Sequence, residues 1–316
     1  MTATLSILTS IRRDLRLESK NSSIITVKLY METTIQTGGK MKHQEYTLQS
    51  KDGINLYAQA WLSELPARAL VILVHGLGEH SGRYTHVAEK FNANGIDVFA
   101  FDQRGHGKSG GPKGHTPSYQ HLIDDITLAI NEGKKVAGED LPTFLYGHSL
   151  GALEVLYFGI KQSETLKGII ATSPPLDLSA TPESKKKLAK FMNPLFPKLT
   201  MPNGLDVNAL SRDPDVVQAY SDDPLVHDKI SVRLGMFMFD GAETVFEKAA
   251  SWHYPLLLMH GSSDQICGIK GSEAFVGKAK NGVTYKRWEG LYHEIHNEPE
   301  KEQVIQAMVD WINAQI

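Results

Sequence analysis

The sequence predicts an α/β protein whose mainly parallel sheet carries helices on both faces. Apolar runs of strand length, at residues 69–74, 98–101 and 255–259, are typical of strands buried on both faces. Amphipathic stretches at residues 84–94 and 118–137 alternate with such runs, as they do in a doubly wound sheet. Functional side chains of these sheets gather in the loops that follow the carboxyl ends of the strands.

The composition is that of a globular protein with a sizeable core. The chain has 316 residues, 41% hydrophobic and 22% charged, which suits one large domain or a domain with an insertion. The net charge of −3 gives no electrostatic basis for binding nucleic acid. No apolar run approaches the roughly 20 residues of a membrane span, so we expect a soluble, cytoplasmic protein. The single cysteine, Cys267, excludes an intramolecular disulfide framework and fits a reducing compartment.

Residues 1–40 differ from the rest of the chain. They are rich in serine and threonine, carry three arginines, and lack a sustained apolar period. The apolar run at residues 5–8 is too short for a signal peptide, and two acidic residues weaken an interpretation as a transit peptide. We therefore expect a poorly ordered extension ahead of the folded domain.

The folded part begins with a hairpin and continues with alternating strands and helices. Asp52-Gly53 supplies the hairpin turn between strands at residues 46–49 and 54–61. The elements after it are, in order, strand 69–74, helix 84–94, strand 97–101, helix 118–137, strand 144–146, a helix from 152, strand 167–171, strand 255–259, strand 283–288 and helix 302–312.

Residues 175–250 interrupt this alternation. Four lysines lie between residues 185 and 190, prolines punctuate the following stretch, and Met-Phe-Met-Phe occupies residues 236–239. We expect an inserted, mostly helical cap here, which leaves residues 41–174 and 251–316 as the core domain.

The stretch Gly147-His148-Ser149-Leu150-Gly151 lies between a predicted strand and a predicted helix. This context is the one that G-x-S-x-G requires to act as a nucleophile elbow. The tight turn strains the serine backbone, and the two glycines let strand and helix approach without a Cβ clash. The pattern alone is weak, so the interpretation depends on partners for Ser149.

Two loops provide those partners. Asp264 follows the strand at residues 255–259, and His293 follows the strand at residues 283–288. A serine needs a general base to take its proton, and the base needs an acid to orient it. The chain order Ser149, Asp264, His293 is the order found in the α/β-hydrolase fold. Asp177 is an alternative acid and His296 an alternative base, but we favour His293 because it comes first after the strand.

An oxyanion hole requires two backbone N–H donors. One comes from the residue after the nucleophile, Leu150, and the other from the loop after the strand at residues 69–74. In that loop, His75-Gly76 forms a tight turn that directs the Leu77 N–H into the site.

Five motifs together resemble the monoacylglycerol lipase and lysophospholipase branch of the α/β-hydrolases. The resemblance covers about residues 44–314, with the cap matching loosely, and its motifs are residues 75–84, 101–109, 147–151, 263–267 and 289–296. It implies an eight-stranded, mostly parallel sheet with an inserted helical cap. It also implies catalysis without a cofactor or a metal.

The resemblance further assigns roles to particular residues. It implies Ser149 as nucleophile, Asp264 as acid and His293 as base, with Leu77 and Leu150 as oxyanion donors. It places Glu79, Arg83 and His296 near the pocket for the glycerol end of a monoacylglycerol, although Glu79 and Arg83 could instead pair and brace their loop. Cys267 matches a cysteine that follows the acid in this branch, where it is either an inhibitor-sensitive thiol or a small buried hydrophobe.

The expected activity is hydrolysis of carboxylic esters of lipids through an acyl-enzyme. Monoacylglycerol, cleaved to glycerol and fatty acid, is the substrate we favour. The alternatives are a lysophospholipase, a broad-specificity short-chain carboxylesterase and, from another class, a non-catalytic lipid-binding protein on a hydrolase scaffold.

The cap supplies apolar residues that could line a tunnel for the acyl chain. They are Leu188, Phe191, Met192, Leu195, Phe196 and residues 236–239. The lysines at residues 185–190, interleaved with apolar residues, indicate either transient contact with an anionic membrane surface or a solvated basic face. The sequence does not predict an oligomeric state.

Overall fold

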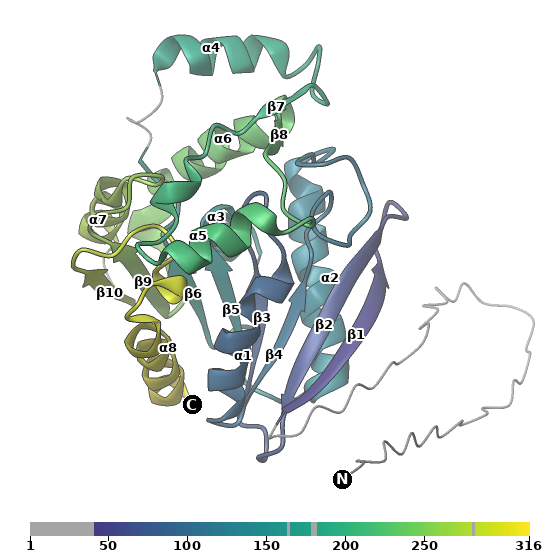
Figure 1. Ribbon diagram of the computed structural model, residues 1–316, viewed down its shortest axis with the longest axis vertical. Coiled ribbons are helices and arrows are strands. Elements are labelled where there is room, and N and C mark those ends of the chain that lie inside the picture. Colours follow the sequence, from purple (N-terminus) through teal and green to yellow (C-terminus); the bar gives the residue numbers. More distant parts are fainter. Residues whose placement is uncertain (1–40, 163–164, 178–181, 280–281) are drawn as a thin grey trace, which may run out of the picture.

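An eight-stranded sheet forms the centre of the structure, a computed structural model that describes residues 41–162, 165–177, 182–279 and 282–316 (Figure 1). The expectation for residues 1–40 lies outside these residues. The sheet order is β1-β2-β4-β3-β5-β6-β9-β10. The strands are β1 (Met41–Gln49), β2 (Asn55–Ser63), β3 (Ala69–Val74), β4 (Ile96–Phe101), β5 (Thr143–His148), β6 (Gly168–Thr172), β9 (Leu256–Gly261) and β10 (Val283–Trp288).

The sheet is parallel from β4 to β10 and antiparallel at its β1–β2 edge. β2 pairs antiparallel with both β1 and β4, and every other neighbouring pair is parallel. All residues of β3, β4, β5, β6 and β9 are buried, in agreement with their continuous apolar sequences. The predicted fold class is therefore confirmed.

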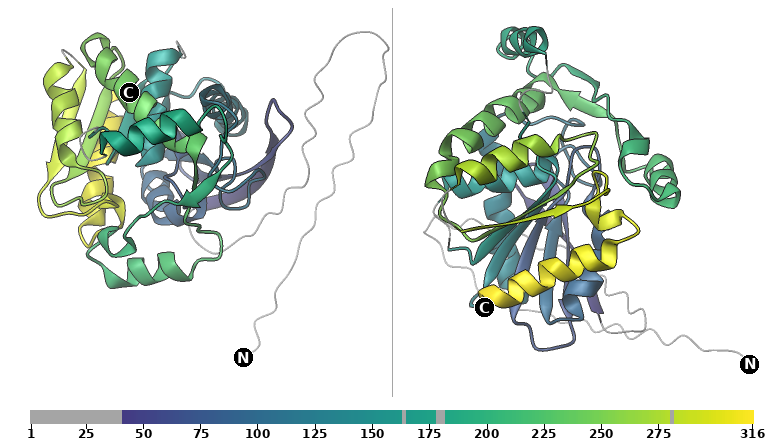
Figure 2. Two further views of the ribbon diagram at one scale, coloured as in Figure 1. Left: turned by 90° about the horizontal axis from the view of Figure 1, so that it is seen from above. Right: turned by 90° about the vertical axis from the view of Figure 1, so that its left-hand side faces the viewer.

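Helices cover both faces of the sheet (Figures 1 and 2). α1 (Thr85–Asn92) and α8 (Lys301–Gln315) pack with one apolar cluster. α2 (Tyr119–Ala137), α3 (Leu150–Lys161) and α7 (Ile269–Lys278) pack with the cluster on the other face. Each helix turns its apolar side toward the sheet, so the two faces are buried separately.

The predicted hairpin is present, but its first strand is longer than expected. Gly53 has a φ of +83° in the turn, a conformation that favours glycine. β1 begins at Met41, opposite Ser63, whereas the sequence predicted a start at Tyr46. The added residues 42–45 are polar or charged, and an edge strand accepts such residues because one of its sides faces solvent.

The segment between β6 and β9 lies over the carboxyl ends of the strands (Figures 1 and 2). It contains α4 (Glu183–Met192), β7 (Thr200–Pro202), η3 (Val207–Ala209), α5 (Pro214–Asp222), β8 (Lys229–Ser231), α6 (Val232–Lys248) and η4 (Ala249–Ser251). α6 packs on α3, and β7 pairs with β8 in a short antiparallel ribbon. We refer to this segment as the cap; the boundaries 175–250 remain a proposal. Within the described ranges, none of the helices combines the length and apolar character that crossing a membrane requires.

Candidate active site

Ser149 occupies a strained turn between β5 and α3. Its φ of +53° is rare for a residue with a side chain. The neighbouring glycines are required by space: a Cβ on Gly147 would lie 2.2 Å from the Gly151 carbonyl oxygen, and one on Gly151 would lie 2.1 Å from the Val74 carbonyl oxygen. The turn therefore has the close strand-to-helix packing that was predicted from the sequence.

The three side chains predicted as a triad form one hydrogen-bonded chain. His293 Nε2 lies 2.9 Å from Ser149 Oγ, and His293 Nδ1 lies 2.8 Å from Asp264 Oδ2. Because an ionised carboxylate only accepts, His293 donates from Nδ1 and its Nε2 accepts the serine proton. This geometry suits transfer of the Ser149 proton to His293.

The surroundings of Asp264 and His293 favour a charged acid beside a basic histidine. Burial alone would raise the pKa of Asp264, but the His293 charge and hydrogen bonds from His260 and His293 lower it below its usual value. The amides of Ile266 and Cys267 also donate to Asp264 Oδ1, at 2.8 and 2.9 Å. Burial would lower the pKa of His293, whereas the charge and hydrogen bond of Asp264 raise it above its usual value.

The alternative acid and base lie elsewhere. Asp177 lies beside Gly268, where a Cβ on that glycine would be 2.6 Å from Asp177 Oδ2. The His296 ring is fully buried, stacks on Tyr84 at 4.8 Å and meets the His148 ring edge-on at 4.7 Å. The histidine within hydrogen-bond distance of Ser149 Oγ is His293, and the carboxylate at its Nδ1 is that of Asp264.

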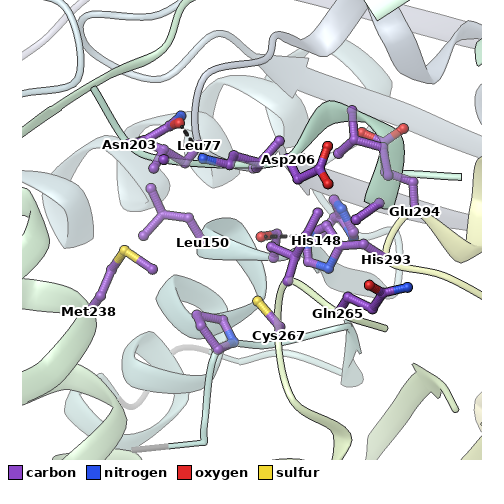
Figure 3. A pocket seen from close by; sticks show the side chains of 18 of the residues that line it. Leu77, His148, Leu150, Asn203, Asp206, Met238, Gln265, Cys267, His293 and Glu294 are labelled. Atoms are coloured by element: carbon purple, nitrogen blue, oxygen red, sulfur yellow. Dashed lines mark hydrogen bonds between the residues drawn. The ribbon is translucent and has the colours of Figure 1, made fainter. Parts of the chain in front are cut away.

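Leu77 and Leu150, the two predicted oxyanion donors, line the same cavity as Ser149. Figure 3 shows the side chains of Leu77 and Leu150 there. Leu150 is the first residue of α3, a position whose N–H has no partner within the helix. The loop that carries Leu77 is fixed by Glu79, whose Oε1 accepts hydrogen bonds from the Gly76 amide at 2.7 Å and the Tyr84 hydroxyl at 2.8 Å. Gln103 also donates to the His75 carbonyl oxygen, at 2.6 Å.

The cavity beside Ser149 has a volume of about 510 Å³, within the usual size range of small-molecule sites. The apolar lining residues from the cap are Pro175, Leu205, Ala209, Leu210, Tyr220, Ile230, Met238 and Phe239. The prediction that the apolar residues of α4 line this cavity is wrong. Phe191 is 69% exposed and Leu188 57% exposed, and neither is among the lining residues.

A buried ion-pair network borders the cavity. The Arg83 guanidinium donates to both Glu294 oxygens at 2.6 and 2.7 Å and to Glu79 Oε2 at 2.8 Å. It also lies 4.7 Å from the centre of the Tyr220 ring. Burial would raise the pKa of Glu294, but the charge and hydrogen bonds of Arg83 hold it well below its usual value.

The three residues predicted as substrate contacts are placed differently from one another. Glu79 lines the cavity beside Glu294. Arg83 is the shared ion-pair partner of Glu79 and Glu294, and His296 is buried and is not itself a lining residue. The alternative interpretation, in which Glu79 and Arg83 pair and brace their loop, describes the contacts that the structure shows.

Two further residues, which no sequence motif marked as functional, contact His293. Ser173, with a φ of +50°, donates from its hydroxyl to the His293 carbonyl oxygen at 2.7 Å. His148 lies with its ring 4.8 Å from the His293 ring, and burial together with the charge of His293 lowers its pKa to about 3. His148 is therefore neutral at pH 7. Ser173 carried no recognisable motif, because its partner lies 120 residues away in the sequence.

A family model described as "Serine aminopeptidase, S33" matches residues 66–300, a range that contains Ser149, Asp264 and His293. The chain belongs to this family. An uncharacterized abhydrolase domain-containing protein of Dictyostelium discoideum is 37% identical over 85% of this chain, and the chain covers 29% of that protein.

Shorter relatives match nearly end to end. A monoacylglycerol lipase of Mycolicibacterium smegmatis is 32% identical over 85% of this chain and 96% of its own length. The phospholipase YtpA of Bacillus subtilis is 33% identical over 78% of this chain and 95% of its own length.

The fold also resembles that of solved structures. The crystal structure of Paleococcus ferrophilus monoacylglycerol lipase has a TM-score of 0.76 and 39% identity, and covers 83% of this chain and 99% of that chain. The resemblance to the monoacylglycerol lipase branch of the α/β-hydrolases, predicted from the motifs, is therefore confirmed.

Proposed function

We propose that this S33-family protein hydrolyses monoacylglycerols to glycerol and fatty acid. The observation that carries the proposal is the hydrogen-bonded chain from Asp264 through His293 to Ser149 at the wall of a cavity lined by both apolar and polar residues. The relatives named as monoacylglycerol lipases support the substrate class. An activated serine beside a lipid-sized cavity suits cleavage of a carboxylic ester.

The reaction proceeds in two halves. Ser149 Oγ attacks the ester carbonyl carbon while its proton passes to His293 Nε2, and the N–H groups of Leu77 and Leu150 hold the oxyanion. The C–O bond to glycerol then breaks, and His293 gives its proton to the departing alcohol oxygen. In the second half, His293 takes a proton from water as the water attacks the acyl carbon. The bond between the acyl carbon and Ser149 Oγ then breaks, the fatty acid leaves, and His293 returns its proton to Ser149 Oγ. Asp264 stabilises the protonated His293 in both halves.

The charge of the cavity favours an uncharged head group. Four carboxylates, Glu79, Asp177, Asp206 and Glu294, are among the described residues that line it, and none of those lining residues is a lysine or arginine. Arg83 forms ion pairs with Glu79 and Glu294, and its positive charge offsets part of their negative charge. An anionic phosphate would meet repulsion here, whereas a glycerol hydroxyl can donate to a carboxylate. This observation favours monoacylglycerol over a lysophospholipid whose head group carries a net negative charge.

A substrate panel on the wild type and Ser149→Ala tests the proposal. The panel contains monoacylglycerols of several chain lengths, lysophosphatidylcholine, triacylglycerol, short p-nitrophenyl esters and an aminoacyl anilide. We expect monoacylglycerol to have the highest kcat/KM and the Ser149→Ala rate to fall by about 10⁴-fold or more. A preference for lysophosphatidylcholine, for short esters alone or for the anilide would overturn the head-group assignment.

If Ser149 in the folded protein did not react with a fluorophosphonate probe, that result would contradict the proposal that the protein is a serine hydrolase. Such a result would favour a non-catalytic lipid-binding protein.

We further propose that the cap contacts membranes transiently through α4 and the segment after it. Six of the eight exposed large hydrophobic side chains among the described residues lie there, namely Leu188, Phe191, Leu195, Phe196, Leu199 and Met201. In Figure 1, α4 is the outermost element of the cap, far from the sheet. An exposed apolar patch flanked by lysines is typical of a surface that inserts shallowly into an anionic bilayer.

A further inference from the structure

A second histidine, His260, lies directly behind the acid of the proposed triad. It is the fifth residue of β9, and its side chain is fully buried. Its Nε2 lies 3.1 Å from Asp264 Oδ2 and 2.7 Å from the Cys267 carbonyl oxygen. Its Nδ1 lies 2.8 Å from Ser272 Oγ, on α7. His260 thus connects β9, the loop that carries the acid and the helix that follows.

The partners of His260 determine where its protons lie. A carbonyl oxygen and a carboxylate only accept hydrogen bonds, so Nε2 must carry a proton and donate to both Cys267 and Asp264. The Ser272 hydroxyl can either donate to Nδ1 or accept from it, so the partners fix the proton on Nε2 alone. Asp264 Oδ2 then accepts two histidine N–H groups, one from His260 and one from His293.

We propose that His260 is a positioning residue that fixes the Asp264 carboxylate and sets the basicity of His293. This inference rests on the proposed function, because it assigns a role within the same hydrolytic site. Hydrogen bonds connect Ser272, His260, Asp264, His293 and Ser149 in one chain. Outer partners of this kind orient the inner groups and tune their charge.

The expected direction follows from the charge on Asp264. A donor that stabilises the carboxylate weakens its attraction for the protonated form of His293. Loss of the His260 donor therefore makes protonated His293 more stable, and the base becomes active only at higher pH. The other groups facing His293 are His148 at 4.8 Å from its ring, and Glu79 and Glu294, whose charges raise its pKa. These groups stay in place when only His260 is changed.

Two amide substitutions separate the donor from the rest of the side chain. In His260→Gln the side-chain NH₂ can occupy the Nε2 position and donate to Asp264. In His260→Asn the shorter side chain reaches only the Nδ1 position beside Ser272 and leaves Asp264 without this donor. His260→Gln keeps the contacts of Nε2 with Asp264 and the Cys267 carbonyl oxygen and loses the contact with Ser272, whereas His260→Asn does the reverse. The comparison therefore tests the Nε2 side of the ring against the Nδ1 side.

The measurement is the pH dependence of kcat/KM with a short p-nitrophenyl ester, which does not depend on the glycerol assignment. For His260→Asn we expect the acid limb to move up by about 0.5–1 pH unit and kcat/KM at its optimum to fall by about 10-fold. His260→Gln should keep the wild-type limb. Equal acid limbs in wild type, His260→Asn and His260→Gln would overturn the proposal, because a purely structural role changes stability and not this pH profile.

A second measurement covers the case in which His260→Asn does not fold. In ¹⁵N-histidine-labelled wild type, NMR should show a proton on His260 Nε2 at the pH of the activity optimum. A His260 that carries its proton on Nδ1 alone would overturn the proposal, because Nε2 could then not donate to Asp264. Absence of any esterase activity in the wild type would instead contradict the proposed function, so the two failures are distinguishable.

Discussion

Ser149 combines backbone strain with reactivity at a single residue. A non-glycine residue at φ +53° costs on the order of 1–3 kcal/mol, and the turn is kept only because surrounding packing imposes it. Here the packing comes from Gly147 and Gly151, whose Cα atoms approach backbone carbonyls too closely for any side chain. The strain places the hydroxyl within 2.9 Å of His293 Nε2. Reactivity thus depends on neighbours that take no part in the chemistry.

Replacing the acid tests the electrostatic role of the triad. In Asp264→Asn, the side-chain NH₂ can donate to His293 Nδ1 and favour the wrong tautomer, and the carboxamide does not stabilise an imidazolium. We expect kcat for ester hydrolysis to fall by about 10³–10⁴-fold. Steady-state kinetics measures this change, with Asp310→Asn, an exposed change on α8, as the control. A loss of less than tenfold in folded Asp264→Asn would argue against Asp264 as the acid.

The pH dependence of the wild type follows from His293. The base must be neutral to accept the Ser149 proton, so activity is lost as the pH falls through the pKa of His293. Asp264 raises that pKa above the ordinary value of 6.5, so the acid limb of kcat/KM should lie above pH 6.5. A pH–rate profile with a soluble ester measures the limb. A midpoint below 6.5 would show that burial outweighs the attraction of Asp264.

At the scale of elements, the sheet was more predictable than the cap. Strands such as β3 and β5 are buried on both faces, so their sequences are continuous apolar runs that can be recognised locally. The cap helices are amphipathic, and their pattern does not say what their apolar side faces. In α6, Phe237 is fully buried, whereas in α4 Phe191 is 69% exposed. The tunnel predicted for α4 failed for this reason.

The junction between β5 and α3 gives a prediction about stability. A Cβ on Gly151 would lie 2.1 Å from the Val74 carbonyl oxygen, a backbone atom that has no freedom to move away. Gly151→Ala should therefore lower the free energy of unfolding by at least about 2 kcal/mol.

The matched control is Gly277→Ala in α7, where a Cβ would meet nothing within 4 Å. It should be neutral or raise the free energy of unfolding by up to about 1 kcal/mol, because alanine favours the helix. Urea denaturation of both variants measures the difference. If Gly151→Ala and Gly277→Ala changed the free energy of unfolding equally, β5 and α3 would be able to move apart without loss of stability.

At the scale of the whole molecule, the order of the triad residues was visible in the sequence and their supports were not. Ser149, Asp264 and His293 each follow a predicted strand. A parallel sheet therefore brings them together at the carboxyl ends of its strands. The supports are single contacts between distant segments. Arg83 meets Glu294 across 211 residues, and no local pattern marks such a pair. His260 directly follows the predicted strand at residues 255–259, and no local pattern marks its contact with Asp264.

The exposed patch on the cap gives a prediction about the whole enzyme at a lipid surface. The double variant Phe191→Ser/Phe196→Ser removes the aromatic pair, whose members are 69% and 58% exposed, without touching the cavity lining. Burying a phenylalanine in an apolar phase contributes about 1.5–3 kcal/mol, and partial insertion of two contributes part of that. We expect binding to vesicles containing phosphatidylglycerol to weaken by roughly 10-fold or more.

Activity on vesicle-borne monoacylglycerol should fall with that binding, whereas kcat/KM for a soluble ester should stay unchanged, because the triad lies far from the patch. Leu65→Ser, which removes an exposed leucine in the loop between β2 and β3, serves as the control and should leave vesicle binding intact. Co-sedimentation at two salt concentrations separates the apolar contribution from that of the lysines on α4, since only the latter is screened. Equal binding by the wild type and the double variant would place the membrane contact elsewhere on the molecule. A parallel loss of soluble-ester activity would show instead that the aromatic pair holds the cap in its active arrangement.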